Sequence, residues 1–412
     1  MKRLVLSDFS AGIDFSQNTL HGENHCEEAL GFLPFRNGVR SQWPSKKMKW
    51  VNEAAAIATL GDELIIFYNS GAIGLLKLVL GDIQETTLRE ETQLVEFHVD
   101  IAGVIRWEVD VIENGVVTGS EYLSGVVACE SQKNEADQSY ERTVLVIPSA
   151  SGDKVQYPTY YPALVDGEPA TLRLPFCQVA TMWDDIPTFG NIMWNKTLFL
   201  SLNPTTAKPF TNYLWLSDPV SPGKIDPRYP VRAADEGAKI VGLHPVEEGL
   251  LVLTTRSDSG NQSGVMLLRG SAADYMQSGD DVSASGSLEV VAPIYMFDSL
   301  YRDTRASCYW NAQQSVLFVS NEGRLYQYRN GRVADITPPG LHENTVDFAE
   351  EITMSNQGLS LLGGSVVADG PYAIFSHEPS GRVWVMQAVG ETAAWTELSL
   401  DIFPLENGMI GD

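Results

Sequence analysis

The residues that could bind a metal gather near the start of the chain. His21 and His25 stand four positions apart and are followed by Cys26 and two glutamates. Two histidines at this spacing on a helix can hold zinc. The glycine and the asparagine between them disfavour a helix, however, and no third ligand follows at a defined spacing. We therefore expect a polar loop here, and neither a metal site nor a cofactor.

Two pairs of adjacent carboxylates could act as the acid and base of a glycosidase. They are Asp184 with Asp185 and Asp280 with Asp281. Adjacent acids in a loop are more commonly solvated turn residues. The sequence also contains no Gly-x-Ser-x-Gly elbow, no Walker loop and no dinucleotide fingerprint. We assign no catalytic residue, and expect that the protein is not an enzyme.

Four aromatic residues, Trp183, Trp194, Tyr213 and Trp215, stand close together in the sequence. Such a cluster can form a platform for a sugar ring. Aromatic residues on strands that face a neighbouring sheet more commonly pack in a core. We expect packing.

The charge balance limits the class of partner. The chain has 28 basic and 53 acidic residues, a formal net charge of -25. A protein that binds a nucleic acid tightly uses Lys and Arg to neutralise the phosphates, which displaces their counterions. The acidic balance of this chain therefore argues against specific DNA binding. An acidic wall would let DNA slide past without holding it. The charge could equally serve only to keep the protein dissolved.

Hydropathy and cysteine spacing indicate a soluble protein made in a cytoplasm. No apolar run approaches the roughly 20 residues that cross a bilayer, and Asp8 interrupts the apolar residues near the start. We expect no membrane insertion. Cys26, Cys129, Cys177 and Cys308 are scattered, which is typical of reduced core residues.

The elements that position these residues are predicted to be short strands. Residues 315–336 read as three strands of alternating apolar and polar residues, separated by Asn321-Glu322-Gly323 and Asn330-Gly331. Asparagine and glycine tolerate the positive φ of tight hairpins, so this pattern predicts an antiparallel meander. Residues 365–398 repeat it.

The strongly apolar strands recur at blade-like intervals. They begin at Leu64, Leu198, Leu250, Val316 and Tyr372, so the last three intervals are 52, 66 and 56 residues. A β-propeller blade is about 40 to 50 residues of four antiparallel strands. We therefore predict an all-β fold, a β-propeller of about five or six blades.

The first interval is too long for one blade, which predicts an inserted small β domain, or a blade plus an insertion. We expect an N-terminal segment and first blade in residues 1–92, the inserted β-rich domain in 93–175, and the remaining blades in 176–412. Helix-favouring composition is confined to segments such as 83–91 and 345–352. One terminus of a propeller commonly completes the sheet of the other, so residues 4–6 could pair with strands near Leu398.

Two stretches resemble the tail nozzle, or tail tubular protein B, of short-tailed bacteriophages. The first, residues 213–230, reads YLWLSDPVSPGKIDPRYP, and its matching positions are Trp215, Ser217, Asp218, Pro219, Asp226 and Pro227. In the second, residues 315–336, Gly323 marks a turn and Asp335 the closing strand. Asp-Pro pairs suit rigid loops, because proline fixes φ and aspartate accepts backbone N–H bonds.

The resemblance implies a structural virion protein of the phage tail. It implies a ring of copies of this chain, six in number, that contacts the portal or adaptor and other tail proteins and forms part of the DNA ejection conduit. Tail fibres are further possible partners, and viral DNA would pass without specific binding. Two alternatives remain open: a receptor-binding or baseplate-proximal tail module, and a glycan-active propeller enzyme.

Overall fold

The structure is a computed structural model of the 412-residue chain. It describes residues 32–41, 54–133, 139–192, 211–275, 288–296, 306–338 and 364–398. Short gaps inside these ranges are 36–37, 62, 80–81, 91–95, 114, 149–154, 166–167, 218–223, 227–229, 236, 256–262, 322, 378–381 and 390–391.

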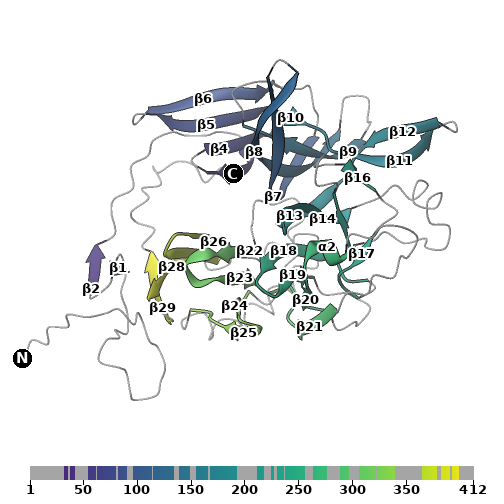
Figure 1. Ribbon diagram of the computed structural model, residues 1–412. Coiled ribbons are helices and arrows are strands. Elements are labelled where there is room, and N and C mark those ends of the chain that lie inside the picture. The colour runs from purple at the N-terminus through teal and green to yellow at the C-terminus, as the bar shows by residue number, and fades with distance from the viewer. Residues whose placement is uncertain are drawn as a thin grey trace, which may run out of the picture. The chain divides into compact units, whose positions relative to one another are not determined.

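The chain is an all-β protein with the blades of a six-bladed β-propeller. Six sheets contain four antiparallel strands each, and each strand pairs with the one before it in the sheet (Figure 1). The predicted fold class is therefore confirmed, with a blade count inside the predicted range. The chain divides into two compact units, residues 48–303 and residues 1–47 with 304–412.

The unit of residues 48–303 contains four blades. The first is β3 (Ala54–Leu60), β4 (Glu63–Tyr68), β5 (Ile73–Val79) and β6 (Asp82–Arg89); the second is β7 (Glu96–Glu113), β8 (Val116–Lys133), β9 (Ser139–Val146) and β10 (Val155–Gln156). The third is β13 (Cys177–Trp183), β14 (Ile186–Ile192), β15 (Tyr213–Leu216) and β17 (Val231–Arg232); the fourth is β18 (Ile240–Val246), β19 (Gly249–Thr254), β20 (Val265–Arg269) and β21 (Leu288–Ala292). Strand β7 contacts β3 and β13, and β13 contacts β18, so the first strands of successive blades are neighbours.

The other unit contains two blades and a hairpin. Its blades are β22 (Ser307–Trp310), β23 (Ser315–Val319), β24 (Leu325–Arg329) and β25 (Arg332–Asp335), and β26 (Gly364–Asp369), β27 (Tyr372–His377), β28 (Arg382–Val389) and β29 (Thr392–Leu398). A 3₁₀ helix, η1 (Asn311–Gln313), joins β22 to β23. The hairpin of β1 (Phe32–Phe35) and β2 (Gly38–Ser41) contacts β28 and β29 through β1.

Residues 93–175 contain both a blade and an additional sheet. Strands β7 to β10 are the second blade, and β11 (Thr159–Val165), β12 (Glu168–Arg173) and β16 (Lys224–Ile225) form a separate three-stranded sheet. Strand β16 runs parallel to β11 and is supplied by the connection between β15 and β17. The two domain boundaries drawn from the sequence, at residues 92/93 and 175/176, remain predictions.

Most of the predicted strand onsets are the second strands of blades. Leu64, Leu250, Val316 and Tyr372 lie at the starts of β4, β19, β23 and β27. The long first interval contains two further second strands, β8 and β14, whose sequences are less uniformly apolar. The onset at Leu198 lies outside the described residues.

Two minor expectations differ from the structure or fall outside it. Residues 83–91, with helix-favouring composition, lie mainly in strand β6, because pairing with β5 outweighs local propensity. Residues 345–352 and 4–6 lie outside the described residues. The helix of the described part is α2 (Ala272–Tyr275), and none there is long and apolar enough to cross a membrane.

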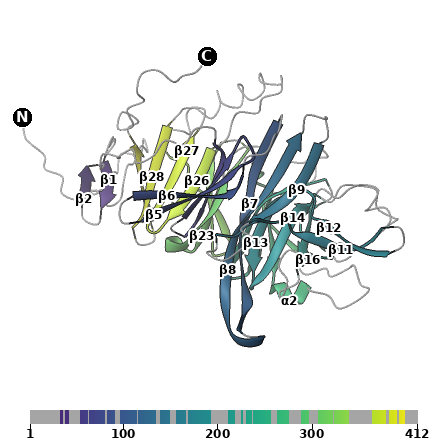
Figure 2. The same ribbon diagram turned by 90° about the horizontal axis from the view of Figure 1, so that it is seen from above.

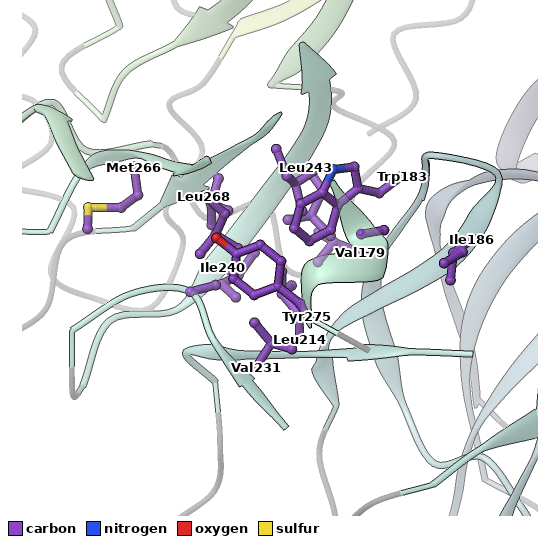
Figure 3. Close-up of a cluster of buried hydrophobic side chains, with 14 residues drawn as sticks. Val179, Trp183, Ile186, Leu214, Val231, Ile240, Leu243, Met266, Leu268 and Tyr275 are labelled. Atoms are coloured by element: carbon purple, nitrogen blue, oxygen red, sulfur yellow. The ribbon is translucent and has the colours of Figure 1, made fainter. Parts of the chain in front are cut away.

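Apolar side chains between neighbouring blades build the core. Every residue of β14 and β19 is buried. Figure 3 shows one cluster, in which Val179 and Trp183 of β13 meet Ile240 of β18 and Leu268 of β20. Burying each such side chain contributes roughly 1.5 to 3 kcal/mol, so the contact between blades is a major source of stability.

Candidate interaction site

The first tail-like motif lies at the end of a strand in the third blade. Trp215 of β15 is fully buried against Phe189 and Ile225. Ser217 is also buried; its amide donates to the carbonyl of Pro187 at 2.8 Å and it forms an isolated bridge with Ile225. The half-buried Asp226 follows β16. Asp218, Pro219 and Pro227 lie outside the described residues.

The second motif stabilises turns in the fifth blade. Gly323 has φ +75°, and its amide donates to the carbonyl of Ser320 at 2.9 Å. One carboxylate oxygen of Asp335 accepts bonds from the amide and the hydroxyl of Thr337, at 2.9 and 2.6 Å. The other accepts from Arg324 at 3.3 Å. Both motif residues therefore fix local backbone geometry.

The predicted carboxylate pair in the third blade occupies a hairpin turn. Asp184 and Asp185 join β13 to β14 with φ +46° and +63°, which is the geometry of a two-residue type I′ turn. A carboxylate oxygen of Asp184 accepts from the amide of Ala272 at 2.7 Å, at the start of α2. The pair is thus used structurally, while Asp280 and Asp281 lie outside the described residues.

The aromatic residues that the structure describes pack. Trp183 and Trp215 are 1% and 0% exposed, which leaves no face for a sugar. The Trp183 ring lies 5.0 Å from Tyr275 between centroids, and Tyr213 lies 6.4 Å from Trp215. Trp194 lies outside the described residues.

Cys129 and Cys177 lack the environment of reactive thiols. Both are buried, and Cys308 is half-buried. Burial raises the pKa of Cys177 to about 12 and that of Cys129 well above its usual value. The described residues contain no group of three or more metal-ligating side chains. His21, His25 and Cys26 lie outside them.

Sequence analysis missed a cluster of arginines where the first two blades meet. Glu130 of β8 is fully buried and bonds Arg89 of β6 at 2.5 Å and Arg142 of β9 at 3.1 Å. The guanidinium carbons of Arg142 and Arg173 lie 4.7 and 4.4 Å from the centre of the Tyr157 ring. We call these five residues the arginine cluster. They are 12 to 84 positions apart from one another in sequence, so no motif signals them.

The arginine cluster has a net positive charge, because its arginines outnumber its carboxylates. It holds three guanidinium groups against one carboxylate, in a chain whose net charge is -25. Arg173 is exposed, and Nη1 of Arg89 is buried without a hydrogen-bond partner among the described atoms. Guanidinium groups bind carboxylates and phosphates through paired N–H donors. This arrangement can therefore accept a further anionic group.

The second blade also extends a long β-hairpin beyond its sheet. Strands β7 and β8 have 18 residues each, and β9 pairs with β8 over residues 126–133. Figure 2 shows β7 and β8 continuing past the strands beside them. Ile105, Trp107 and Leu123 still contact the third blade. We call the segment beyond them, residues 108–122, the hairpin arm.

The hairpin arm presents acidic and apolar groups to solvent. Residues 115–122 are all exposed, and Val116 and Val117 are 64% and 56% exposed. Glu108 and Asp110 of β7 are exposed, as is Glu121 of β8. The arm contains no Lys or Arg. An exposed hairpin with apolar residues at its end is suited to binding another protein.

Comparison with known proteins bears on the fold alone. No protein-family model and no curated protein matches the chain. Structural neighbours include the Cps50 (Swd1) β-propeller domain of Myceliophteria thermophila, with TM-score 0.35 and 10% identity over 84% of this chain and 100% of that one. The C-terminal WD40 domain of Sif2 has TM-score 0.33 and 11% identity over 84% of this chain and 83% of that one. PorZ of Porphyromonas gingivalis has TM-score 0.31 and 8% identity over 86% of this chain, which spans 39% of PorZ.

Proposed function

We propose that this protein is a structural component of a bacteriophage tail, a nozzle or tail-tube ring that forms part of the DNA ejection conduit. The observation that carries the proposal is the tail-like motif around Trp215 and Ser217, and a second, separate resemblance that includes Gly323 and Asp335 adds to it. In this role the chain connects the portal or adaptor to distal tail parts. It has no catalytic step.

Three features of the chain support such a role. Rigid blades with buried strands provide a wall that keeps its shape. The hairpin arm provides an exposed element for contact with another copy or with an adaptor. A net charge of -25 lets DNA pass without adhering, because an acidic surface repels phosphate.

The position of the protein in the virion tests this proposal. We would label purified virions with an antibody to this chain and image them by negative-stain electron microscopy. Label at the tail, between the portal and the distal parts, is the expected result. Virions without tail signal, or a source genome without portal, capsid and adaptor genes beside this one, would refute it.

The second candidate is a receptor-binding or baseplate-proximal tail module, which the exposed apolar end of the hairpin arm favours. It predicts label at the distal end of the tail and binding of the purified protein to host cells. The enzyme alternative predicts turnover on a panel of polysaccharides. Asp184, one of the candidate carboxylates of such an enzyme, already accepts a hydrogen bond from the amide of Ala272.

A further inference from the structure

We propose that the arginine cluster of one copy binds the hairpin arm of a second copy of this chain. The proposal deepens the proposed ring by naming its contact, and it rests on the proposed function only in assuming that copies associate. The arm supplies the carboxylates of Glu108 and Asp110, and the cluster supplies the exposed Arg173 and the remaining donors of Arg142.

The cluster has unused capacity for a carboxylate. Arg142 bonds Glu130 through Nε, and Arg89 does so through Nη2 while its Nε donates to the carbonyl of Gly71 at 2.8 Å. Nη1 of Arg89 has no partner among the described atoms but is buried, so Arg89 adds positive charge to the cluster and no accessible donor. Arg173 contacts the face of Tyr157 and is otherwise exposed. A carboxylate placed here gains charge-assisted hydrogen bonds to groups already held in position.

The arm has the complementary chemistry on one face. Glu108 pairs with Tyr122 and Asp110 with Ser120 in the β7–β8 register, so these four side chains share a face. Trp107 and Leu123 are on the other face, which packs against the third blade nearer the base of the hairpin. The face with Glu108 and Asp110 is therefore the one left available, and at its base Arg106 lies over the Tyr122 ring, with its guanidinium carbon 4.4 Å from the ring centre.

The arm and the cluster of one copy cannot meet. Tyr122, opposite Glu108, and Glu130 lie eight positions apart on the same strand β8. At about 3.3 Å per residue they are separated by roughly 25 Å, and a paired strand does not fold back on itself. A contact between them must join two copies through different surfaces. Such a head-to-tail contact generates a ring when its rotation closes and a filament when it does not.

The net charge of the chain favours a contact between the arginine cluster of one copy and the hairpin arm of another. Two copies with -25 each repel over most of their surfaces, so a contact that matches a cationic site with an acidic one is favoured over a contact between two acidic surfaces. The arginine cluster is such a cationic site, and the arm is an acidic element free of Lys and Arg. The exposed Val116 and Val117 add apolar area to the contact.

Self-association of the purified full chain tests the proposal. We would measure it by sedimentation and mass photometry for the wild type and for Glu108→Lys and Arg173→Glu. Each substitution should weaken association by about tenfold or more. Mixing the two variants should restore it, because the new lysine then faces the new glutamate. Glu247→Lys and Arg332→Glu change the charge equally at exposed positions elsewhere and should leave association unchanged.

The direction of the Glu108→Lys effect is diagnostic. This substitution makes the chain less negative, so a nonspecific charge effect would strengthen association, whereas loss of the arm contact weakens it. Circular dichroism would establish that each variant is folded. A wild-type protein that stays monomeric, or association unchanged in both variants, would overturn the contact. Neither result bears on the virion labelling, which tests the proposed function separately.

Discussion

At the scale of residues, Glu130 holds two arginines together inside the protein. It is fully buried and bonds both Arg89 and Arg142. Glu130→Gln keeps the size of the side chain but leaves two guanidinium groups without a negative partner, which costs about 3 to 5 kcal/mol of unfolding free energy. Urea denaturation followed by circular dichroism measures this. Glu121→Gln, at an exposed position, is the matched control and should change stability by less than about 0.5 kcal/mol; equal losses in both would contradict the prediction.

Another residue, His244 of β18, should make stability depend on pH. Burial lowers its pKa to about 4 from 6.5 because it penalises the charged form. The unfolded chain therefore takes up a proton below pH 6.5 that the folded protein accepts only near pH 4. Stability is lost as the pH falls through this window, by roughly 1 to 3 kcal/mol.

The comparison variant for this effect is His244→Gln, which cannot titrate. Unfolding free energies of both proteins are measured between pH 7 and pH 4. Carboxylates titrate in both proteins, so the difference between the two curves isolates the histidine. The wild type should lose more stability over the window than the variant does, and parallel curves would refute the assigned pKa.

At the scale of elements, a hydrogen bond and an aromatic contact attach α2 to the third blade, and the hydrogen bond depends on one carboxylate. Asp184 accepts from the amide of Ala272, and Tyr275 at the other end of α2 packs on Trp183. Asp184→Ala removes the acceptor and, at φ +46°, replaces a residue that tolerates left-handed backbone with one that tolerates it less well. We expect a loss of about 1 to 2 kcal/mol in chemical denaturation.

Asparagine separates the two contributions at this position. It tolerates positive φ and retains an acceptor oxygen, so Asp184→Asn should lose less than half as much stability as Asp184→Ala. Equal stability of the alanine variant and the wild type would show that the bond to Ala272 contributes nothing.

The same elements indicate how far the sequence predicts the structure. Blades whose second strand is continuously apolar, such as β19 with Leu250 to Leu253, were recognisable because such runs are rare outside buried strands. The second blade was harder to recognise, because its strands alternate and then continue into the solvent-exposed arm. The sequence predicts its residues as an insertion, or as a blade plus an insertion. The arginine cluster could not be predicted, since strand pairing and blade packing alone bring Arg89, Glu130 and Arg142 together.

The hairpin of β1 and β2 carries a related prediction about the end of the chain. Strand β1 contacts β29, the last strand of the sixth blade. Strand β29 is the edge strand of its sheet, so deleting residues 1–41 removes the hairpin that contacts it and uncovers this edge to other chains, which promotes aggregation. Size-exclusion chromatography with light scattering should detect larger species. Deletion of residues 1–31, which keeps both strands, is the control, and identical profiles for the two deletions would contradict the role of β1.

At the scale of the whole molecule, the net charge of -25 opposes the compact state. Folding brings these charges together, and salt screens their repulsion over a Debye length of about 10 Å at 0.1 M. The buried pairs between Glu130 and the two arginines are screened much less. Raising NaCl from about 10 to about 300 mM at pH 7 should therefore raise the melting temperature.

The test is differential scanning calorimetry at both salt concentrations, repeated near the sequence pI of about 4.5. Carboxylate protonation removes most of the net charge there, so the salt effect should shrink. This second condition separates screening from a general effect of salt on apolar surface, which would persist at the lower pH. A melting temperature that falls with salt at pH 7 would mean that favourable surface ion pairs, such as Arg269 with Glu289, outweigh the repulsion across the molecule.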